Sequence, residues 1–143
     1  MPLDHDQICR MLVRKTAEGI IYVDGANRIR LWNEGATRIF GFNEGEALGQ
    51  SLDIIIPENL RERHGTGFDQ TMATGVTRYG AGDLLAVPAL RKDGSRISIE
   101  FTILPFHDET GKIAGIGAVI RDVTVRFAQT KELRKRIAEL ERR

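Results

Sequence analysis

The chain is expected to be an α+β protein, with a five-stranded antiparallel sheet, short helices on one face and a flanking helix at each end. Two observations predict this class. The second half contains three strand-like runs separated by the turn sequences 91–94 and 108–111. In the first half, a strand pair is followed by several short helical segments and by no further strand before residue 84. An open sheet of this kind has an apolar face that must be covered, and only the short helices are available to cover it.

The N-terminal segment predicts one helix and one hairpin. Residues 4–18 carry apolar side chains at helical spacing, which indicates a helix. Two strand-like stretches, 19–23 and 29–32, flank the turn sequence 24–27, so a hairpin is expected there. The apolar residues that recur at this spacing are Ile8, Met11 and Leu12, and Cys9 can be counted with them.

The middle of the chain is expected to form the covering helices. Asn33 suits the N-cap of a short helix over 36–42. Residues 43–49 form another short turn or helix. A longer helix is predicted for Glu58–Thr74, with Gly75 as its C-cap.

The three later strands form a meander. They are expected at 84–90, 97–103 and 113–120, and Asp93-Gly94 is a tight-turn signal because glycine accepts a positive φ. Period-two alternation places one set of apolar side chains on a single face of the sheet. That set is Ile97, Ile99, Phe101 and Ile103.

Composition bounds the class of protein. The 143 residues suffice for one domain, and 41% hydrophobic with 29% charged residues is typical of a soluble globular chain. A net charge of +1 gives no overall attraction to nucleic acid or membranes. Cys9 is the only cysteine, no apolar run approaches the ~20 residues of a membrane span, and no signal peptide is evident. We therefore expect a cytoplasmic protein with no direct nucleic-acid or membrane partner.

The sequence contains no recognisable catalytic motif. Neither a Ser/His/Asp set nor a phosphate-binding loop is present, and Gly80-Ala81-Gly82 is expected to be a turn. His5 and His107 are isolated, so a metal site at either one would need further ligands. We expect no enzymatic activity.

At this point the order of elements and a set of motifs resemble the PAS domain family. The resemblance covers about residues 16–127. It rests on Glu18-Gly19-Ile20-Ile21, Trp32-Asn33-Glu34, Ala47-Leu48-Gly49-Gln50, Ile56-Pro57, Thr74-Gly75, Arg91-Lys92-Asp93-Gly94 and Asp122-Val123-Thr124.

This resemblance implies a sensor module of a bacterial-type signal-transduction protein, in two-component signalling or transcription regulation. It divides the chain into a flanking helix (1–15), a PAS sensor domain (16–124) and a C-terminal signalling helix (125–143). In the family, a cofactor or small ligand sits between the apolar sheet face and the covering helices. A ligand-free PAS module for protein interaction and dimerisation is the alternative.

His64 is the main candidate for a cofactor ligand. The stretch 59–68 resembles the haem PAS domain of the FixL oxygen-sensor kinases, in which a histidine at the matching place is the proximal iron ligand. That resemblance implies haem b bound by His64, with Arg61 and Arg63 as partners of its propionates. The apolar pocket would be lined by Leu84, Leu85, Phe101, Ile103, Ile116 and Val119.

Two alternatives at this site stay open. His64 is equally compatible with a helix-surface or capping role in a PAS domain that holds no haem. The FixL type also has an arginine before the Asp-Gly turn that responds to bound oxygen, whereas Asp83, Leu84 or Leu85 stands at the matching position here. Flavin is not expected, because the photoactive flavin class needs a cysteine that this chain lacks in the corresponding helix.

The C-terminal segment is expected to be a basic helix. Residues 121–143 carry eight basic and four acidic side chains, a pattern that a solvated helix face explains. Leu133, Ile137 and Leu140 are spaced four and then three residues apart, as in a coiled-coil seam. This spacing favours a homodimer that relays a signal to an output domain or partner, and a helix resting on its own domain is the alternative.

Overall fold

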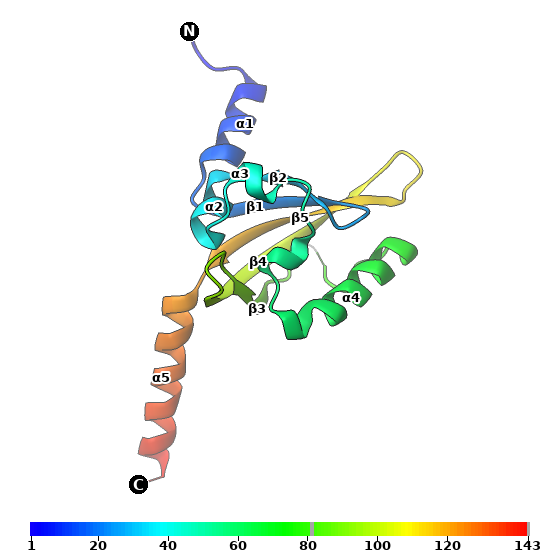
Figure 1. Cartoon of the computed structure of the whole chain (residues 1–143). Coiled ribbons are helices and arrows are strands. Elements are labelled where there is room, and N and C mark those ends of the chain that lie inside the picture. Colours follow the sequence, from blue (N-terminus) through cyan, green and yellow to red (C-terminus); the bar gives the residue numbers. More distant parts are fainter. Residues whose placement is uncertain (81, 143) are drawn as a thin grey trace.

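A single antiparallel sheet forms the centre of the computed structural model, which describes residues 1–80 and 82–142. Ala81, within the predicted turn 80–82, and Arg143, at the predicted end of the last helix, lie outside the described residues. The strands follow the order β2-β1-β5-β4-β3 across the sheet (Figure 1). The α+β class and the five antiparallel strands are thus confirmed. The strands are β1 (Gly19–Asp24), β2 (Ile29–Trp32), β3 (Leu85–Leu90), β4 (Arg96–His107) and β5 (Ile113–Asp122).

The predicted Asp-Gly turn joins β3 to β4. Gly94 has a φ of 86°, which glycine adopts without steric cost. The Asp93 carboxylate accepts a hydrogen bond from the Ser95 amide at 2.9 Å. This turn sets a register in which Leu90 lies opposite Arg96.

Short helices cover one face of the sheet, as predicted. Their buried side chains, Ala36, Ile39, Phe40, Ala47, Ile55 and Phe68, pack with those of the strands in one hydrophobic core. The segments are α2 (Glu34–Phe40), α3 (Glu44–Ala47), the 3₁₀ turns η1 (Leu52–Ile55) and η2 (Glu58–Leu60), and α4 (Arg61–Thr74).

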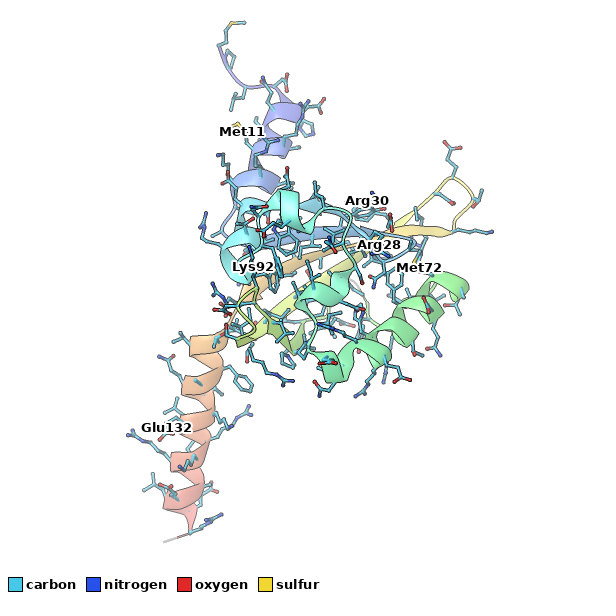
Figure 2. The ribbon with its side chains drawn as sticks, viewed as in Figure 1. Met11, Arg28, Arg30, Met72, Lys92 and Glu132 are labelled. Atoms are coloured by element: carbon cyan, nitrogen blue, oxygen red, sulfur yellow. The ribbon has the colours of Figure 1, made fainter. Side chains whose placement is uncertain are left out.

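The longer covering helix differs from its predicted form. The Leu60 amide donates to the Pro57 carbonyl at 2.9 Å, which closes a tight three-residue turn. The α-helix consequently begins at Arg61 and not at Glu58. Further along, Met72 on α4 approaches the β1–β2 turn, and its Cε lies 3.4 Å from the position that a Cβ on Gly25 would take (Figure 2).

Two helices leave the sheet at the same end and point in opposite directions (Figure 1). They are α1 (His5–Lys15) and α5 (Thr124–Glu141), and neither contains a buried residue. Glu18 and Arg121, one beside each helix, form an ion pair of 2.7 Å. The helix predicted for residues 4–18 is shorter because Thr16 adopts a ψ of 147°, which turns the chain into the first strand. No helix in residues 1–80 or 82–142 has the length and apolar character needed to cross a bilayer.

Candidate ligand-binding site

His64 lies on the side of α4 that faces the sheet. Phe68 and Met72 follow it at four-residue spacing and therefore share its helix face. Phe68 is buried and Met72 packs against the core. The Nδ1 atom of His64 is buried, and it has no hydrogen-bond partner among the described residues. Buried polar atoms are usually paired, so this nitrogen has capacity for a ligand.

The surroundings of His64 favour its neutral form. Burial lowers the pKa of the imidazole below its ordinary value, while the nearby Asp53 carboxylate opposes the shift. Since the ordinary value is about 6.5, the ring is uncharged at pH 7. A neutral imidazole keeps the free lone pair that metal binding requires.

The inner face of the sheet supplies an apolar wall. Phe101 lies opposite Ile120, and Ile103 lies opposite Ala118, so both belong to the face that carries the core. Ile116 packs against the core from β5. Leu85 pairs with Phe101 across β3 and β4 and shares the same face. Four of the six residues expected to line a pocket are thus on the core side.

The other two expected lining residues lie elsewhere. Leu84 precedes β3 and its side chain is 63% exposed. Val119 alternates with Ala118 and Ile120, which face the core, and it therefore points to the opposite face of the sheet. The expectation that Leu84 and Val119 line the pocket is therefore corrected, because Leu84 is exposed ahead of β3 and Val119 of β5 faces away from the core.

The two candidate arginines occupy different environments at the start of α4. Arg61 is half-buried, and its Nε donates to the Ile56 carbonyl at 3.0 Å. Arg63 is exposed. Only Arg61 is therefore held in place by a hydrogen bond to the segment before the helix.

Phe68 and Met72 of α4 pack against the hydrophobic core. Two surface hollows formed by the described residues lie away from His64. One lies beside the start of α5, and the other lies along the side of α1. The described residues also contain no group of three His, Cys, Asp or Glu side chains suited to a metal ion.

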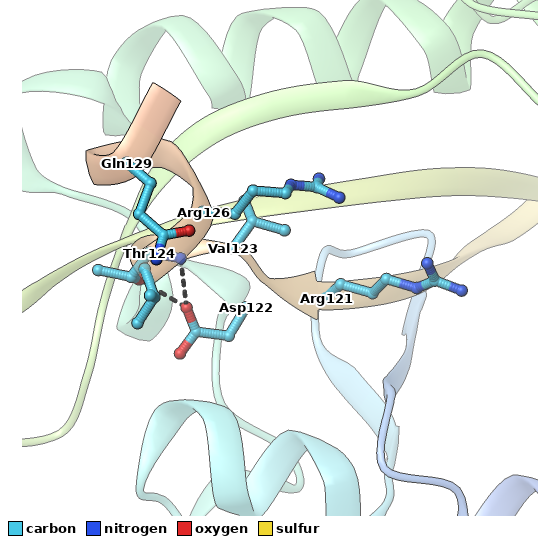
Figure 3. A pocket seen from close by; sticks show the side chains of 7 residues that line it. Arg121, Asp122, Val123, Thr124, Arg126 and Gln129 are labelled. Atoms are coloured by element: carbon cyan, nitrogen blue, oxygen red, sulfur yellow. Dashed lines mark hydrogen bonds between the residues drawn. The ribbon is translucent and has the colours of Figure 1, made fainter. Parts of the chain in front are cut away.

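The exit from the sheet to α5 is a hydrogen-bonded junction. The Asp122 carboxylate accepts hydrogen bonds from the Thr124 amide at 3.0 Å and from its hydroxyl at 2.5 Å (Figure 3). The Thr124 hydroxyl oxygen in turn accepts a hydrogen bond from the Ser98 amide at 3.0 Å. The Ser98 carbonyl accepts from the Val123 amide at 2.9 Å. These contacts attach the first turn of α5 to β4.

Two sets of contacts in the structure, one at this junction and one at Asn33 before α2, were not evident from the sequence. Arg126 on α5 forms an ion pair with Glu100 on β4. Asn33, predicted only as a helix cap, also bonds to three other segments of the chain. No spacing pattern links residues 26 positions apart, so only the fold could reveal the first pair.

The sheet and its covering helices define an α+β domain of the PAS type, and the chain belongs to the PAS-fold family. The family model described as "PAS fold" matches residues 13–127. The resemblance stated from the sequence is therefore confirmed.

Two relatives are named as sensors. The chain is 28% identical over 138 residues to sensor protein FixL of Bradyrhizobium diazoefficiens, a match that covers 92% of this chain and 25% of that protein. It is 27% identical over 119 residues to oxygen sensor protein DosP of Escherichia coli, covering 83% of this chain and 14% of that protein. The chain thus spans a quarter or less of the length of these relatives.

Solved structures share the fold. A PAS domain from Colwellia psychrerythraea superimposes with a TM-score of 0.72 at 20% identity, covering 85% of this chain and 98% of that one. The structure of an RNA-binding light-oxygen-voltage receptor gives a TM-score of 0.72 at 19% identity, covering 96% of this chain and 38% of that one. At these identities the likeness shows the fold alone.

Proposed function

We propose that this chain is a PAS sensor module that binds haem b, or another small ligand, between α4 and the sheet and relays its state through α5 in a homodimer. One observation carries the proposal: the buried, unpartnered Nδ1 of a neutral His64 on the core side of α4. The similarity to two proteins named as sensors supports the same role.

Each candidate residue has a role in this proposal. His64 would hold the iron through an imidazole nitrogen. Arg61 and Arg63 would neutralise the propionates at the edge of the site. The apolar wall that would keep water from the iron consists of Leu85, Phe101, Ile103 and Ile116. Haem bound there would supply an open iron coordination position for a small gaseous ligand.

In this proposal α4 moves to admit the ligand. The helix is held to the core weakly enough to allow this movement. Phe68 is the only buried residue of the helix. Segments with few buried contacts open at low free-energy cost. The neighbouring helix α2, in contrast, has four buried residues and is expected to stay in place.

The route from ligand to output runs along β4. Phe101 and Ile99 of this strand face the core, and the intervening Glu100 faces outward and pairs with Arg126 of α5. A ligand that displaces Ile99 and Phe101 also displaces Glu100 between them, the residue that pairs with α5. A shift of this kind needs different ligand affinities in the two arrangements.

The downstream partner is an output domain or a separate protein that reads α5. The two named relatives are several times longer than this chain, which supports an output region in the full signalling protein. We assign the module to the cytoplasm and give it no catalytic role of its own.

A second candidate is a ligand-free PAS module that serves dimerisation alone. The hydrophobic core favours it, because fifteen hydrophobic residues of the described ranges 1–80 and 82–142 are already buried without a ligand. The absorption spectrum distinguishes the two functions.

The test is to express the protein with a supply of haem and record its ultraviolet and visible spectrum. The proposal predicts a Soret band that is lost in His64→Ala. His107→Ala is the matched control, because His107 is exposed at the end of β4, and it should keep the band. A protein that folds but shows no Soret band leaves the ligand-free module, or another ligand, as the function.

A further inference from the structure

The first half of α4 contains two glycines that its packing does not require. Gly65 and Gly67 have no atom within 4 Å of the position that a Cβ would take. Neither glycine has a positive φ, so the backbone does not require them either. Alanine would fit at both positions. Relative to alanine, each glycine in a helix interior shifts the equilibrium between helix and open chain about fivefold toward the open chain.

Fixed points on both sides of the glycines delimit a short segment. At one end, Nε of Arg61 donates to the Ile56 carbonyl at 3.0 Å. At the other end, the Phe68 side chain is buried and Met72 packs against the core. We name residues 62–67, which lie between these points, the lid segment.

The lid segment has few contacts of its own. It contains no buried residue, and most of its side chains are exposed. No described side chain caps the start of the helix at Leu60. His64 is half-buried, and its Nδ1 atom has no hydrogen-bond partner among the described residues. A segment with so few contacts opens at low free-energy cost.

The second half of α4 is held more firmly. It carries both core contacts of the helix, those of Phe68 and Met72 (Figure 2). At its end Gly75 adopts a φ of 73°, and its amide donates to the Thr71 carbonyl at 2.9 Å. A helix that ends in this way has its last carbonyl groups satisfied. The two halves of α4 therefore differ in stability.

We propose that the lid segment opens by local unfolding while Phe68 and Met72 stay packed, and that Gly65 and Gly67 set how often it opens. Each opening uncovers Nδ1 of His64 and admits a small ligand beside it. This inference rests on the proposed function, in which a ligand reaches His64. It limits the movement of α4 to residues 62–67 and names the residues that control access to the site.

Hydrogen exchange followed residue by residue by NMR tests the lid segment in the purified chain without any ligand. In the wild type, the amides of 65–67 should exchange faster than those of 72–74, whose helical acceptors lie outside the lid segment. The double variant Gly65→Ala with Gly67→Ala should slow exchange at 65–67 about 25-fold, after correction for intrinsic rates. The strands should exchange as before.

Gly45→Ala is the matched control for the double variant. Gly45 lies in the short helix α3, where a Cβ would meet Oδ1 of Asn43 at an ordinary 3.5 Å. This variant should leave exchange at 65–67 unchanged. Unchanged exchange in the double variant would show that the glycines do not set the opening. Equal slowing at 65–67, at 72–74 and in the strands would show that the segment does not open alone. Either result overturns the lid.

The rate of ligand entry is measured separately, with haem as the probe. In a chain that gives the Soret band of the proposed function, the band should grow more slowly after haem addition in the double variant than in the wild type. Equal rates would overturn the lid as the control of access. A chain without a Soret band overturns haem as the ligand, while the exchange measurement still decides whether the lid segment opens. The two failures are therefore distinguishable.

Discussion

Asn33 is the residue on which the arrangement of the first half depends most. It is 5% exposed, and its side chain uses all of its hydrogen-bonding capacity. The Oδ1 atom accepts from the amides of Ala36 and Ile20 at 2.9 and 2.8 Å. The Nδ2 group donates to the carbonyls of Val13 and Glu18 at 2.7 and 3.0 Å. One amide thus fixes α1, β1 and α2 relative to one another.

We predict that Asn33→Ala lowers the free energy of unfolding by about 2–4 kcal/mol, because it removes a helix cap and leaves buried backbone groups unpaired. Chemical denaturation measures the change. Asn43→Ala is the control, since Asn43 caps the short helix α3 at an exposed position and should cost only about 1 kcal/mol. Equal losses in the two variants would show that Asn33 acts only as a cap.

For single residues, the sequence predicts contacts with neighbours in the chain better than contacts with residues far away in the chain. The cap formed by Asn33 with Ala36 and the turn at Asp93-Gly94 depend on neighbours in the chain, and both are confirmed. The prediction that Val119 lines the pocket is wrong, because the run 113–120 carries apolar residues on both faces of its strand. Its period-two pattern therefore has no clear phase, and the pairing of β5 with β1 and β4 settles it.

Among the elements, the sheet and its covering helices were predictable, while the 3₁₀ turns were not. Strands and helices leave a periodic pattern over many residues, whereas η1 and η2 span four and three residues and show no repeat. The inward direction of His64 followed from the structure, because α4 has only one buried residue and so a weak apolar stripe. Its role as a ligand remains a prediction.

The junction of β4 with α5 is the element that must be firm for a signal to pass. We predict that Thr124→Val lowers the free energy of unfolding by about 1–2 kcal/mol, because the Ser98 amide loses its acceptor and Asp122 loses a donor. Hydrogen exchange should become faster at Ser98 and in the first turn of α5.

Thr130→Val is the control for this junction. Thr130 lies on the same helix but is exposed, so its replacement should change neither stability nor exchange at Ser98. If both threonine variants behave alike, the junction does not hold α5, and the relay through β4 loses its physical basis.

At the scale of the whole molecule, the seam of α5, formed by Leu133, Ile137 and Leu140, is exposed. Residues of α5 outside the seam are largely charged, so the helix gains little by resting on its own domain. Its only ion pair to the sheet within residues 1–80 and 82–142, Arg126–Glu100, lies in its first turn. The seam further along is exposed, as the α5 pair of the proposed function requires.

Charge exchange along α5 tests the direction of the pair. With Leu133 and Leu140 at heptad position d, Arg136 at g of one helix would meet Glu141 at e′ of its partner in a parallel pair. Glu141→Arg places two like charges at each of these contacts. It should raise the dimer dissociation constant about 3- to 30-fold, since each exposed ion pair contributes up to about 1 kcal/mol and symmetry creates two. Adding Arg136→Glu restores opposite charges in a parallel pair and should return the constant to near the wild-type value. Arg136 also lies 3.9 Å from Glu132 within its own helix, so the single variant Arg136→Glu reports the loss of that contact. A double variant that dimerises as weakly as Glu141→Arg alone would mean that the helices do not pair in parallel.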